Sequence, residues 1–393
     1  MKNHNFDEVI QFKGTHSVKW ENMDKLTKHA NDDTLPLWIA DMDFACPPAV
    51  LTAMHDRVNK GCFGYSYQDE PYLKSVTGWL KKRFDWQVEE TNIFLSGGVL
   101  HALHALFAAF TEKGDGIIIQ CPVYHPFIKI PTGMERKVVN NALIDTDGDY
   151  TIDFDDLENK ASAPENKVML FCSPHNPVGR VWNDDELRKV GEICLKHDVL
   201  LISDEIHFDL LRQNVTHTPI ATLFPETDKI ITCTAPSKTF NMAGMHISNI
   251  IIENAEYQQK WLKEVGVVTP NPLGLVATQA AYNEGEEWLS ELKAHLDDNF
   301  KFAEEFIAKH MPKAKMKIPE GTYFLWLNLS GYDLEDEKLD ALMLTEANVF
   351  LEGGTMFGKE GAGYQRINIA CRRATLEDAL TRISDALNRV DNR

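Results

Sequence analysis

Between residues 50 and 285 the chain alternates short apolar runs with helical patterns, and this alternation constrains the fold most. Six runs rich in β-branched residues recur: "NIFLS", "GIIIQC", "KVMLFC", "VLLISDE", "KIITCTA" and "SNIIIEN". Their cores are apolar throughout, which is typical of strands buried on both faces of a sheet. Because helical patterns separate several of the runs, we predict an α/β fold with a mostly parallel sheet sandwiched by helices.

One of these helical patterns carries its own start signal. The stretch "NDDELRKVGEICLKHD" has Asn183 in the N-cap position and Glu186 three residues later. This spacing predicts a capping box, in which each residue satisfies the backbone N–H of the other. Apolar residues then recur at helical spacing from Leu187 onward, so we expect a helix with one buried face.

The pattern changes near residue 285, and a chain of 393 residues is too long for one ordinary core. The long amphipathic helix "EWLSELKAHLDDNFKFAEEFIAKH" is followed by the strand-like runs "TYFLWLNL", "VFLEGG" and "QRINIAC". We therefore predict an N-terminal arm and part of the small domain over residues 1–49, a large domain over 50–285, and a smaller α+β domain over 286–393.

Charge and cysteine usage exclude several function classes. The net charge is −19, so the surface repels nucleic acid and anionic membranes, and we expect neither as a partner. The seven cysteines are scattered without C-x-x-C spacing, which argues against a disulfide framework or a zinc site. No signal-peptide core and no apolar run near the roughly 20 residues that span a bilayer is present. We expect a reduced, cytoplasmic protein without a metal ion.

Polar residues follow the predicted strands at the point where each strand ends. Because ligands of open α/β sheets bind at the carboxyl ends of strands, these residues are candidates for a binding site. In chain order they are Gly97, Gly98 and Val99, then Tyr124, Asn176, Asp204, Ser237 and Lys238. Taken singly, the glycines and Asn176 are ordinary turn residues, and Tyr124 is more simply explained by packing.

Two of these residues are harder to explain as ordinary structure. Asp204 ends an apolar strand, where burying a carboxylate costs several kcal/mol unless a cation meets it. Lys238 follows "KIITCTA" and has small, hydroxylated neighbours rather than charges. Pyridoxal phosphate (PLP) needs this combination: a lysine for a Schiff base, an acid at its pyridine nitrogen, and an anion cradle. A stacking ring and a donor to its phenolic oxygen complete the requirement.

The chain resembles PLP enzymes of the aspartate-aminotransferase superfamily, fold type I. The segments "SPHNPVGR", "SDEIH" and "APSKTFNMAG" carry this resemblance, in that order. Within the superfamily the chain is similar to the cystathionine β-lyase (C–S lyase) branch, the MalY/PatB type. "LPLWIADMDF", "FGYSY", "PVYHPF", "YTIDFDDLE", "EGTYFLWL" and "RINIAC" match that branch. The resemblance covers almost the whole chain.

The resemblance implies a role for each site residue. Lys238 would form the Schiff base, Asp204 would pair with the pyridine nitrogen, Asn176 would donate to the phenolic oxygen, and Tyr124 would stack on the ring. Gly98, Val99 and Ser237 would hold the phosphate. Arg366 would bind the substrate α-carboxylate through its guanidinium fork, beside Asn176. Tyr65 would reach the cofactor phosphate and substrate of the neighbouring subunit, which implies a homodimer with shared active sites.

Two positions depart from the aminotransferase pattern. His246 stands where aminotransferases typically have an arginine that grips the phosphate, and His207 where they have a tyrosine that reaches the phenolic oxygen. We still expect both histidines at the cofactor. Their presence favours the lyase branch.

The resemblance implies α,β-elimination from L-cystathionine or related S-substituted cysteines, which yields a thiol, pyruvate and ammonia. Lys238 would act as the general base, and Lys238 or Tyr124 would protonate the departing sulfur. One alternative is an aminotransferase, which uses the same cofactor but needs a keto-acid acceptor. A second alternative is a regulatory interaction protein, which would not need Lys238 or Asp204.

Overall fold

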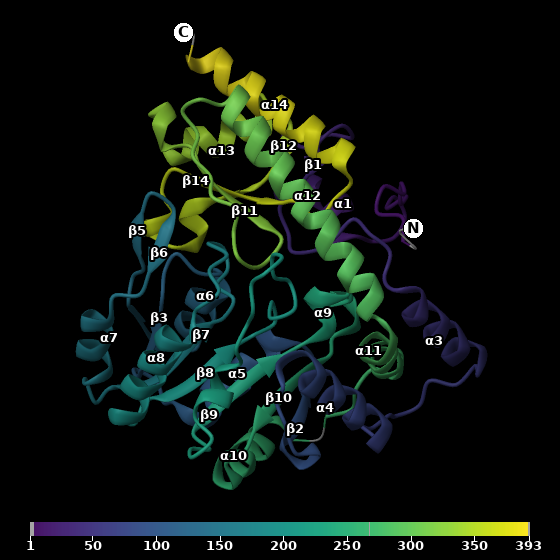
Figure 1. Cartoon of the computed structure of the whole chain (residues 1–393), viewed down its shortest axis with the longest axis vertical. Helices are drawn as coiled ribbons and strands as arrows, with labels where there is room; N and C mark the ends of the chain where they lie inside the picture. Colours follow the sequence, from purple (N-terminus) through teal and green to yellow (C-terminus); the bar gives the residue numbers. More distant parts are fainter. Residues whose placement is uncertain (1–3, 267, 392–393) are drawn as a thin grey trace.

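A seven-stranded sheet forms the centre of the lower part of the molecule in Figure 1. The computed structural model describes residues 4–266 and 268–391. In spatial order the strands are β2 (Ile93–Ser96), β10 (Ser248–Ile252), β9 (Ile230–Thr234), β8 (Leu200–Asp204), β7 (Asn166–Cys172), β3 (Gly116–Ile119) and β4 (Lys137–Asn140). Strand β10 runs opposite to the other six strands of this sheet. The predicted α/β class and mostly parallel sheet are therefore confirmed, and all six apolar runs are strands.

Helices cover both faces of this sheet. Along β3, Ile117 and Ile119 pack on one face with the helices α5 (Val99–Phe110), α6 (Pro126–Gly133) and α10 (Ala255–Val265). Ile118, between them, faces the opposite side with α7 (Phe154–Ala161) and α8 (Asp184–Lys196). This alternation explains why the strands are apolar throughout, since successive side chains enter two different cores.

The predicted start of α8 is confirmed. Asn183 is the N-cap, and its side-chain oxygen accepts from the backbone N–H of Glu186 at 3.0 Å. The Glu186 carboxylate accepts in return from the backbone N–H of Asn183 at 2.9 Å. Leu187, Val190 and Ile193 form the buried face of the helix.

The upper part of Figure 1 is a smaller lobe with its own core. Its antiparallel sheet has the order β11 (Phe324–Asn328), β14 (Tyr364–Asn368) and β13 (Glu352–Gly353). Around it lie α12 (Glu286–His310), α13 (Asp336–Thr345) and α14 (Arg373–Asp391). The short strand β1 (Leu35–Pro36), from the N-terminal segment, pairs in parallel with β12 (Val349–Phe350). The domain boundaries at 49 and 285 stay predictions.

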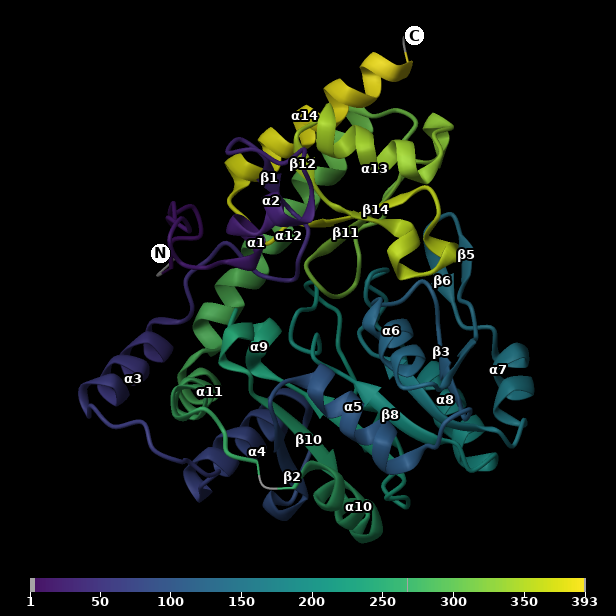
Figure 2. The ribbon, with the colours of Figure 1, turned by 180° about the vertical axis from the view of Figure 1, so that it is seen from behind.

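The N-terminal segment is tied to both parts of the molecule, and Figure 2 shows it from behind. Asn241, in the loop after α9 (Pro236–Thr239), donates to the carbonyls of Met42 and Phe44 and accepts from the N–H of Met42. Asn368, at the end of β14, donates to the carbonyls of Ile39 and Asp41 at 2.7 Å. Two asparagine side chains thus hold residues 39–44, which form no strand of the seven-stranded or the three-stranded sheet.

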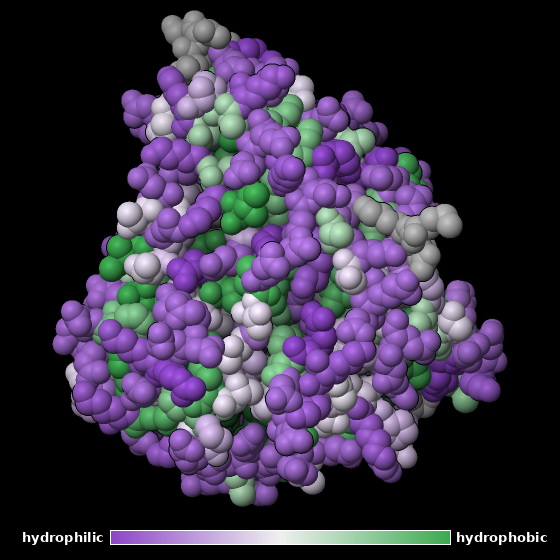
Figure 3. All heavy atoms as spheres, viewed as in Figure 1, coloured by the Kyte–Doolittle hydropathy of each residue, from purple (hydrophilic) through white to green (hydrophobic). Residues whose placement is uncertain are grey.

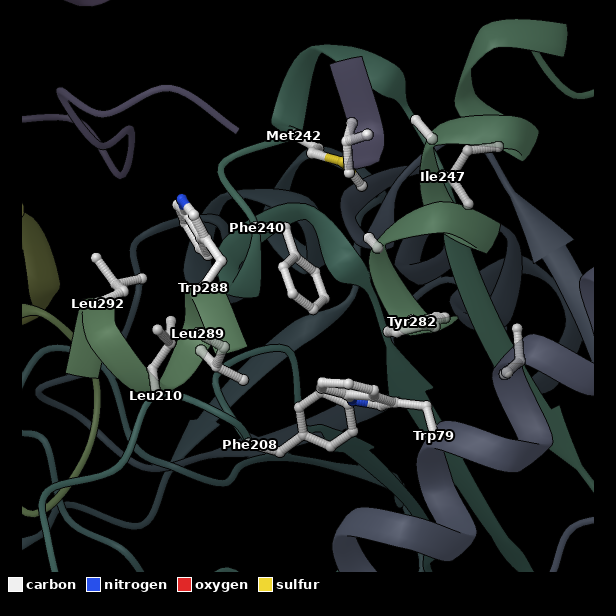
Figure 4. Close-up of a cluster of buried hydrophobic side chains, with 14 of the residues drawn as sticks. Trp79, Phe208, Leu210, Phe240, Met242, Ile247, Tyr282, Trp288, Leu289 and Leu292 are labelled. Carbon is white, nitrogen blue, oxygen red and sulfur yellow. The ribbon is translucent and has the colours of Figure 1, made fainter. Parts of the chain in front are cut away.

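An aromatic cluster surrounds Phe240, and Figure 4 shows this ring between those of Trp79, Tyr282 and Trp288. Phe240, which caps α9, is fully buried and packs against Trp79, Tyr282 and Trp288, with ring centroids 5.5, 6.1 and 6.2 Å away. These partners belong to α4 (Glu70–Phe84), α11 (Pro272–Glu284) and α12. The loop that follows β9 is therefore anchored by packing with three helices.

The N-terminal part of the chain adds two further helices. The short α1 (Val18–Glu21) belongs to the arm, and α3 (Pro48–Asn59) packs beside α11.

Hydrophilic residues cover most of the face shown in Figure 3. Among the described residues, no helix combines the length and apolar character needed to cross a bilayer.

We predict that Phe240→Ala destabilises the protein by about 3–5 kcal/mol, because it removes a ring from a closely packed core and leaves a cavity. The free energy of unfolding would be measured by urea titration of the cofactor-free protein. Leu262→Ala is the matched control, since its side chain is 44% exposed and its loss should change stability by less than about 0.5 kcal/mol. Equal effects of the two substitutions would contradict the packing argument.

Candidate active site

Five chain segments leave the sheet on the same side, at the carboxyl ends of five strands. The strands β3, β7, β8 and β9 are parallel neighbours or near neighbours, and β2 runs in their direction because β10 reverses it twice. Their carboxyl ends therefore lie on the same side. The residues that follow these ends are Gly98, Tyr124, Asn176, Asp204 and Lys238. The register of Cys172 with Asp204, and of Asp204 with Cys233, brings the last three strand ends level.

Lys238 lies in the single turn of α9. Its Nζ donates to the carbonyl of Ala40 at 3.0 Å, and the same carbonyl accepts from the hydroxyl of Tyr323 at 2.9 Å. The pKa of Lys238 is lowered, chiefly because burial disfavours its charged form. Asp41 opposes this shift and Arg366 adds to it. A lysine with a lowered pKa is more readily neutral, as a nucleophile or base must be.

Asp204 is a buried carboxylate with few groups nearby to stabilise its negative charge. It is 4% exposed, and among the described residues its carboxylate accepts a single hydrogen bond, at Oδ1 from the backbone N–H of Ile206 at 3.2 Å. Burial raises its pKa to about 7, and Glu205 contributes in the same direction, whereas Lys238 opposes it. Such a group has a strong tendency to pair with a cation.

The adjacent Glu205 is, by contrast, fully satisfied. Its carboxylate is buried and accepts from Ser203 Oγ at 2.9 Å, from the backbone N–H of Ile220 at 3.1 Å, and contacts His217 Nε2 at 2.8 Å. Of these two consecutive buried acids, Glu205 therefore has more hydrogen-bond partners in the described residues than Asp204.

Arg366 and Asn176 are in direct contact. Arg366 Nη1 donates to Asn176 Oδ1 at 2.8 Å, which leaves the Asn176 amide N–H groups free to donate elsewhere. Arg366 Nη2 is paired with Glu352 across the antiparallel pair β13–β14. The guanidinium is 1% exposed and lies 3.9 Å from the ring centroid of Phe324.

Tyr124 and His207 are both close enough to Arg366 for its charge to influence their pKa values. The backbone N–H of Tyr124 donates to the carbonyl of Asn176 at 3.0 Å, and burial raises the pKa of its phenol to about 12. His207 is buried, its Nδ1 has no partner among the described residues, and its ring packs about 6 Å from Tyr323 and Phe324. Burial lowers its pKa to about 3, so it is neutral.

The N-terminus of α5 is open toward the site. Gly98 precedes the helix with φ at 110°, a conformation that favours glycine, and no side chain caps the helix. A Cβ added at Gly97 or Gly98 would meet nothing within 4 Å. The free N–H groups of Val99 and its neighbours therefore face open space, where an anion is favoured.

Three predicted residues are less closely tied to this group. Ser237 is partly exposed beside Lys238, and its hydroxyl has no hydrogen bond within residues 4–266 and 268–391. His246 is exposed with φ at 52°. Tyr65 is 96% exposed and makes no described hydrogen bond. The structure thus gathers Tyr124, Asn176, Asp204, His207, Lys238 and Arg366, while the roles of all the predicted residues stay proposals.

The residues present fit PLP. A buried carboxylate with an unmet preference for a cation suits a protonated pyridine nitrogen, and a lysine of lowered pKa lies on the next strand end. The uncapped N-terminus of α5 suits the phosphate.

Comparisons with known proteins agree with this geometry. The family model "Aminotransferase class I and II" matches residues 32–383. The chain belongs to this family. It is 42% identical to cystathionine β-lyase PatB of Bacillus subtilis (strain 168), over 98% of this chain and 100% of the relative.

Two solved structures are also similar. Cystalysin from Treponema denticola, which contains pyridoxal 5′-phosphate, aligns with a TM-score of 0.95 at 37% identity, over 98% of this chain and 99% of that one. The PLP-bound C–S lyase from Staphylococcus hominis aligns with a TM-score of 0.94 at 38% identity, over 98% of each chain.

Two residues of the site were missed by reasoning from the sequence. Tyr323 binds the carbonyl that Lys238 also binds, and no local signal distinguishes it from a packed tyrosine. Glu352 is 5% exposed and paired with Arg366. It lies in the apolar stretch "VFLEGG", so the argument that singled out Asp204, an acid at the end of an apolar run, could also have found Glu352.

We predict that the stability of the cofactor-free protein depends on pH through Asp204. Its pKa is about 7 when folded and 3.8 as the ordinary value, so the folded state binds a proton that the unfolded state has released. Stability therefore falls as pH rises from about 4 to 7. Asp204→Asn removes this cost, and its gain over wild type should be about 2–3 kcal/mol larger at pH 8 than at pH 5.

Urea unfolding at the two pH values measures this difference. Asp198→Asn is the control, because its carboxylate is 85% exposed and should show no such pH dependence. A gain from Asp204→Asn that is the same at both pH values would show that Asp204 is not buried as a neutral acid.

Proposed function

We propose that the protein is a PLP-dependent carbon–sulfur β-lyase that acts on L-cystathionine and related S-substituted cysteines. The similarity to cystathionine β-lyase PatB over nearly the whole chain carries this proposal, because the site residues alone would also serve an aminotransferase. The relatives named as C–S lyase and cystalysin support it.

The cofactor would be held by residues at the carboxyl edge of the sheet. Lys238 would bind it covalently, Asp204 would keep a proton on its ring nitrogen, and Tyr124 would stack on its ring. Asn176 would donate to the phenolic oxygen through the amide N–H groups that Arg366 leaves free. Gly98, Val99 and Ser237 would hold the phosphate, with His207 and His246 as further cofactor contacts.

Bound PLP supplies an electron sink for the bonds at the substrate Cα. Arg366 would hold the substrate α-carboxylate and so set the orientation of the Cα–H bond. Lys238, whose lowered pKa favours the neutral amine, would remove the Cα proton. In this proposal the base lies at the end of one strand and the carboxylate anchor on the smaller lobe.

The departing sulfur needs a proton as its bond to Cβ breaks. Lys238, after accepting the Cα proton, can donate it, and Tyr124 is protonated at neutral pH because its pKa is raised to about 12. The balanced reaction consumes the thioether and one water and gives a thiol, pyruvate and ammonia. With L-cystathionine the thiol is homocysteine.

We propose further that two copies of the chain share their active sites and work in the cytoplasm. Tyr65 and Tyr67 are 96% and 76% exposed, which suits contact with a second subunit. All seven cysteines are unpaired, as expected in a reducing compartment.

We predict that Lys238→Ala abolishes formation of both pyruvate and thiol from L-cystathionine with PLP and no keto acid, while far-UV circular dichroism stays unchanged. Wild type should release the two products in equal amounts. Lys229→Ala, at a surface lysine paired with Asp198, should keep full activity. Activity that appears only after a keto acid is added would identify an aminotransferase, and retained turnover in Lys238→Ala would disprove the assignment of the base.

We predict that mixing two inactive variants restores activity if the sites are shared. When Lys238→Ala and Tyr65→Ala chains are unfolded and refolded together, half of the dimers are mixed, and each mixed dimer has one intact site. Activity should recover to about a quarter of wild type. A mixture of Lys238→Ala with Asp204→Asn is the control, because both residues come from one chain and no intact site forms. No recovery in the first mixture would place Tyr65 outside the neighbouring site.

A further inference from the structure

Glu352 is paired with Arg366, the residue proposed to bind the substrate α-carboxylate. Arg366 Nη1 is bound to Asn176, and Nη2 is bound to the Glu352 carboxylate and lies 3.5 Å from the carbonyl of Trp38. Phe324 and Phe357 pack against the guanidinium, with centroids 3.9 and 4.8 Å from its central carbon. Both the rings and the acid therefore enclose the cation.

Contacts other than the ion pair with Glu352 also hold the guanidinium. Asn176 holds Nη1, and the two aromatic rings hold the plane, so three contacts remain if the acid becomes an amide. A glutamine can still accept a hydrogen bond from Nη2. What Glu352 adds is a negative charge, 5% exposed, beside the cation.

The negative charge of Glu352 also influences other residues of the site. Glu352 raises the pKa of both Tyr124 and Lys238, although it is not the largest influence on either. It therefore acts on the same space as the residues at the strand ends. A substrate carboxylate that approaches Arg366 would meet a second carboxylate already bound there, and like charges at short range repel each other strongly where water is excluded.

We propose that Glu352 is an internal competitor for Arg366, which weakens the binding of the substrate α-carboxylate and so sets the affinity of the site for amino acids. The proposal rests on the proposed role of Arg366 as the carboxylate anchor. Glu352 bound to Arg366 neutralises a buried cation in the substrate-free enzyme. The substrate must share or displace this partner, so part of its binding energy is used to replace one ion pair by another.

The test compares two ligands that differ only in the carboxylate. L-Alanine has no leaving group at Cβ, and ethylamine is the same molecule without its carboxylate. Dissociation constants for the holoenzyme would be measured from the change in cofactor absorbance. Glu352→Gln should tighten L-alanine binding about five- to tenfold and leave ethylamine within twofold, because only L-alanine brings the competing charge.

Glu335→Gln is the matched control. It removes one negative charge from the same lobe, but its side chain is 77% exposed and pairs with Lys338, so both dissociation constants should stay unchanged. Arg366→Lys should weaken L-alanine and not ethylamine. If Glu352→Gln does not fold, Glu352→Asp replaces it, and its shorter reach should tighten L-alanine two- to threefold.

The outcomes are distinct. Unchanged or weaker L-alanine binding in Glu352→Gln would overturn the proposal, because Glu352 would then position Arg366 rather than compete with its ligand. Equal tightening of both ligands would also overturn it in favour of a general charge effect. L-Alanine binding that is indifferent to Arg366→Lys would remove the basis of the proposal. None of these results depends on pyruvate release, so a failure of the lyase assignment would be seen separately.

Discussion

The parallel arrangement of the central strands is the constraint on which the site depends. A parallel sheet is covered by helices on both faces, so its strands have no side that can carry a charge without burying it. Polar groups are tolerated where the strands end, and parallel strands end together. Asp204 and Lys238 become neighbours for this reason, although 33 residues separate them in the chain. Strand β10 is antiparallel to both β9 and β2, so β2 runs in the same direction as the parallel strands and its carboxyl end lies on their side.

The charged groups near these strand ends differ in how many hydrogen-bond and ion-pair partners the protein gives them. This difference separates groups with a structural role from those to which we assign a role in the reaction. Glu205 has three protein partners and serves to hold β8 to the loop around His217 and Ile220. Asp204 has one backbone donor and a raised pKa. Arg366 lies between these extremes, since it is well enclosed and its partner Glu352 is the one that we propose a ligand must displace. Groups left with incomplete partners are those to which the chemistry is assigned.

Sequence patterns predicted the elements whose signals are local. The six buried strands and the capping box of Asn183 depend on composition and spacing within a few residues. Strand β4 was missed because it lies at an edge, and its residues from Lys137 to Asn140 are only partly buried. The pairing of Glu352 with Arg366 could not be read from the chain, because it requires the register of two strands joined by a long loop. The contact of Tyr323 with Ala40 could not be read from the chain either, because the two residues are 283 positions apart.

The carbonyl of Ala40 has two donors, the amine of Lys238 and the hydroxyl of Tyr323. A buried carbonyl that loses its single partner costs about 1–3 kcal/mol, but this one keeps Tyr323 when the lysine departs. In the proposed mechanism the amine leaves this carbonyl and returns to it, while Asn241 and Asn368 hold the N-terminal segment in place. The proposed movement of Lys238 therefore does not disturb the backbone that supplies the carbonyl of Ala40.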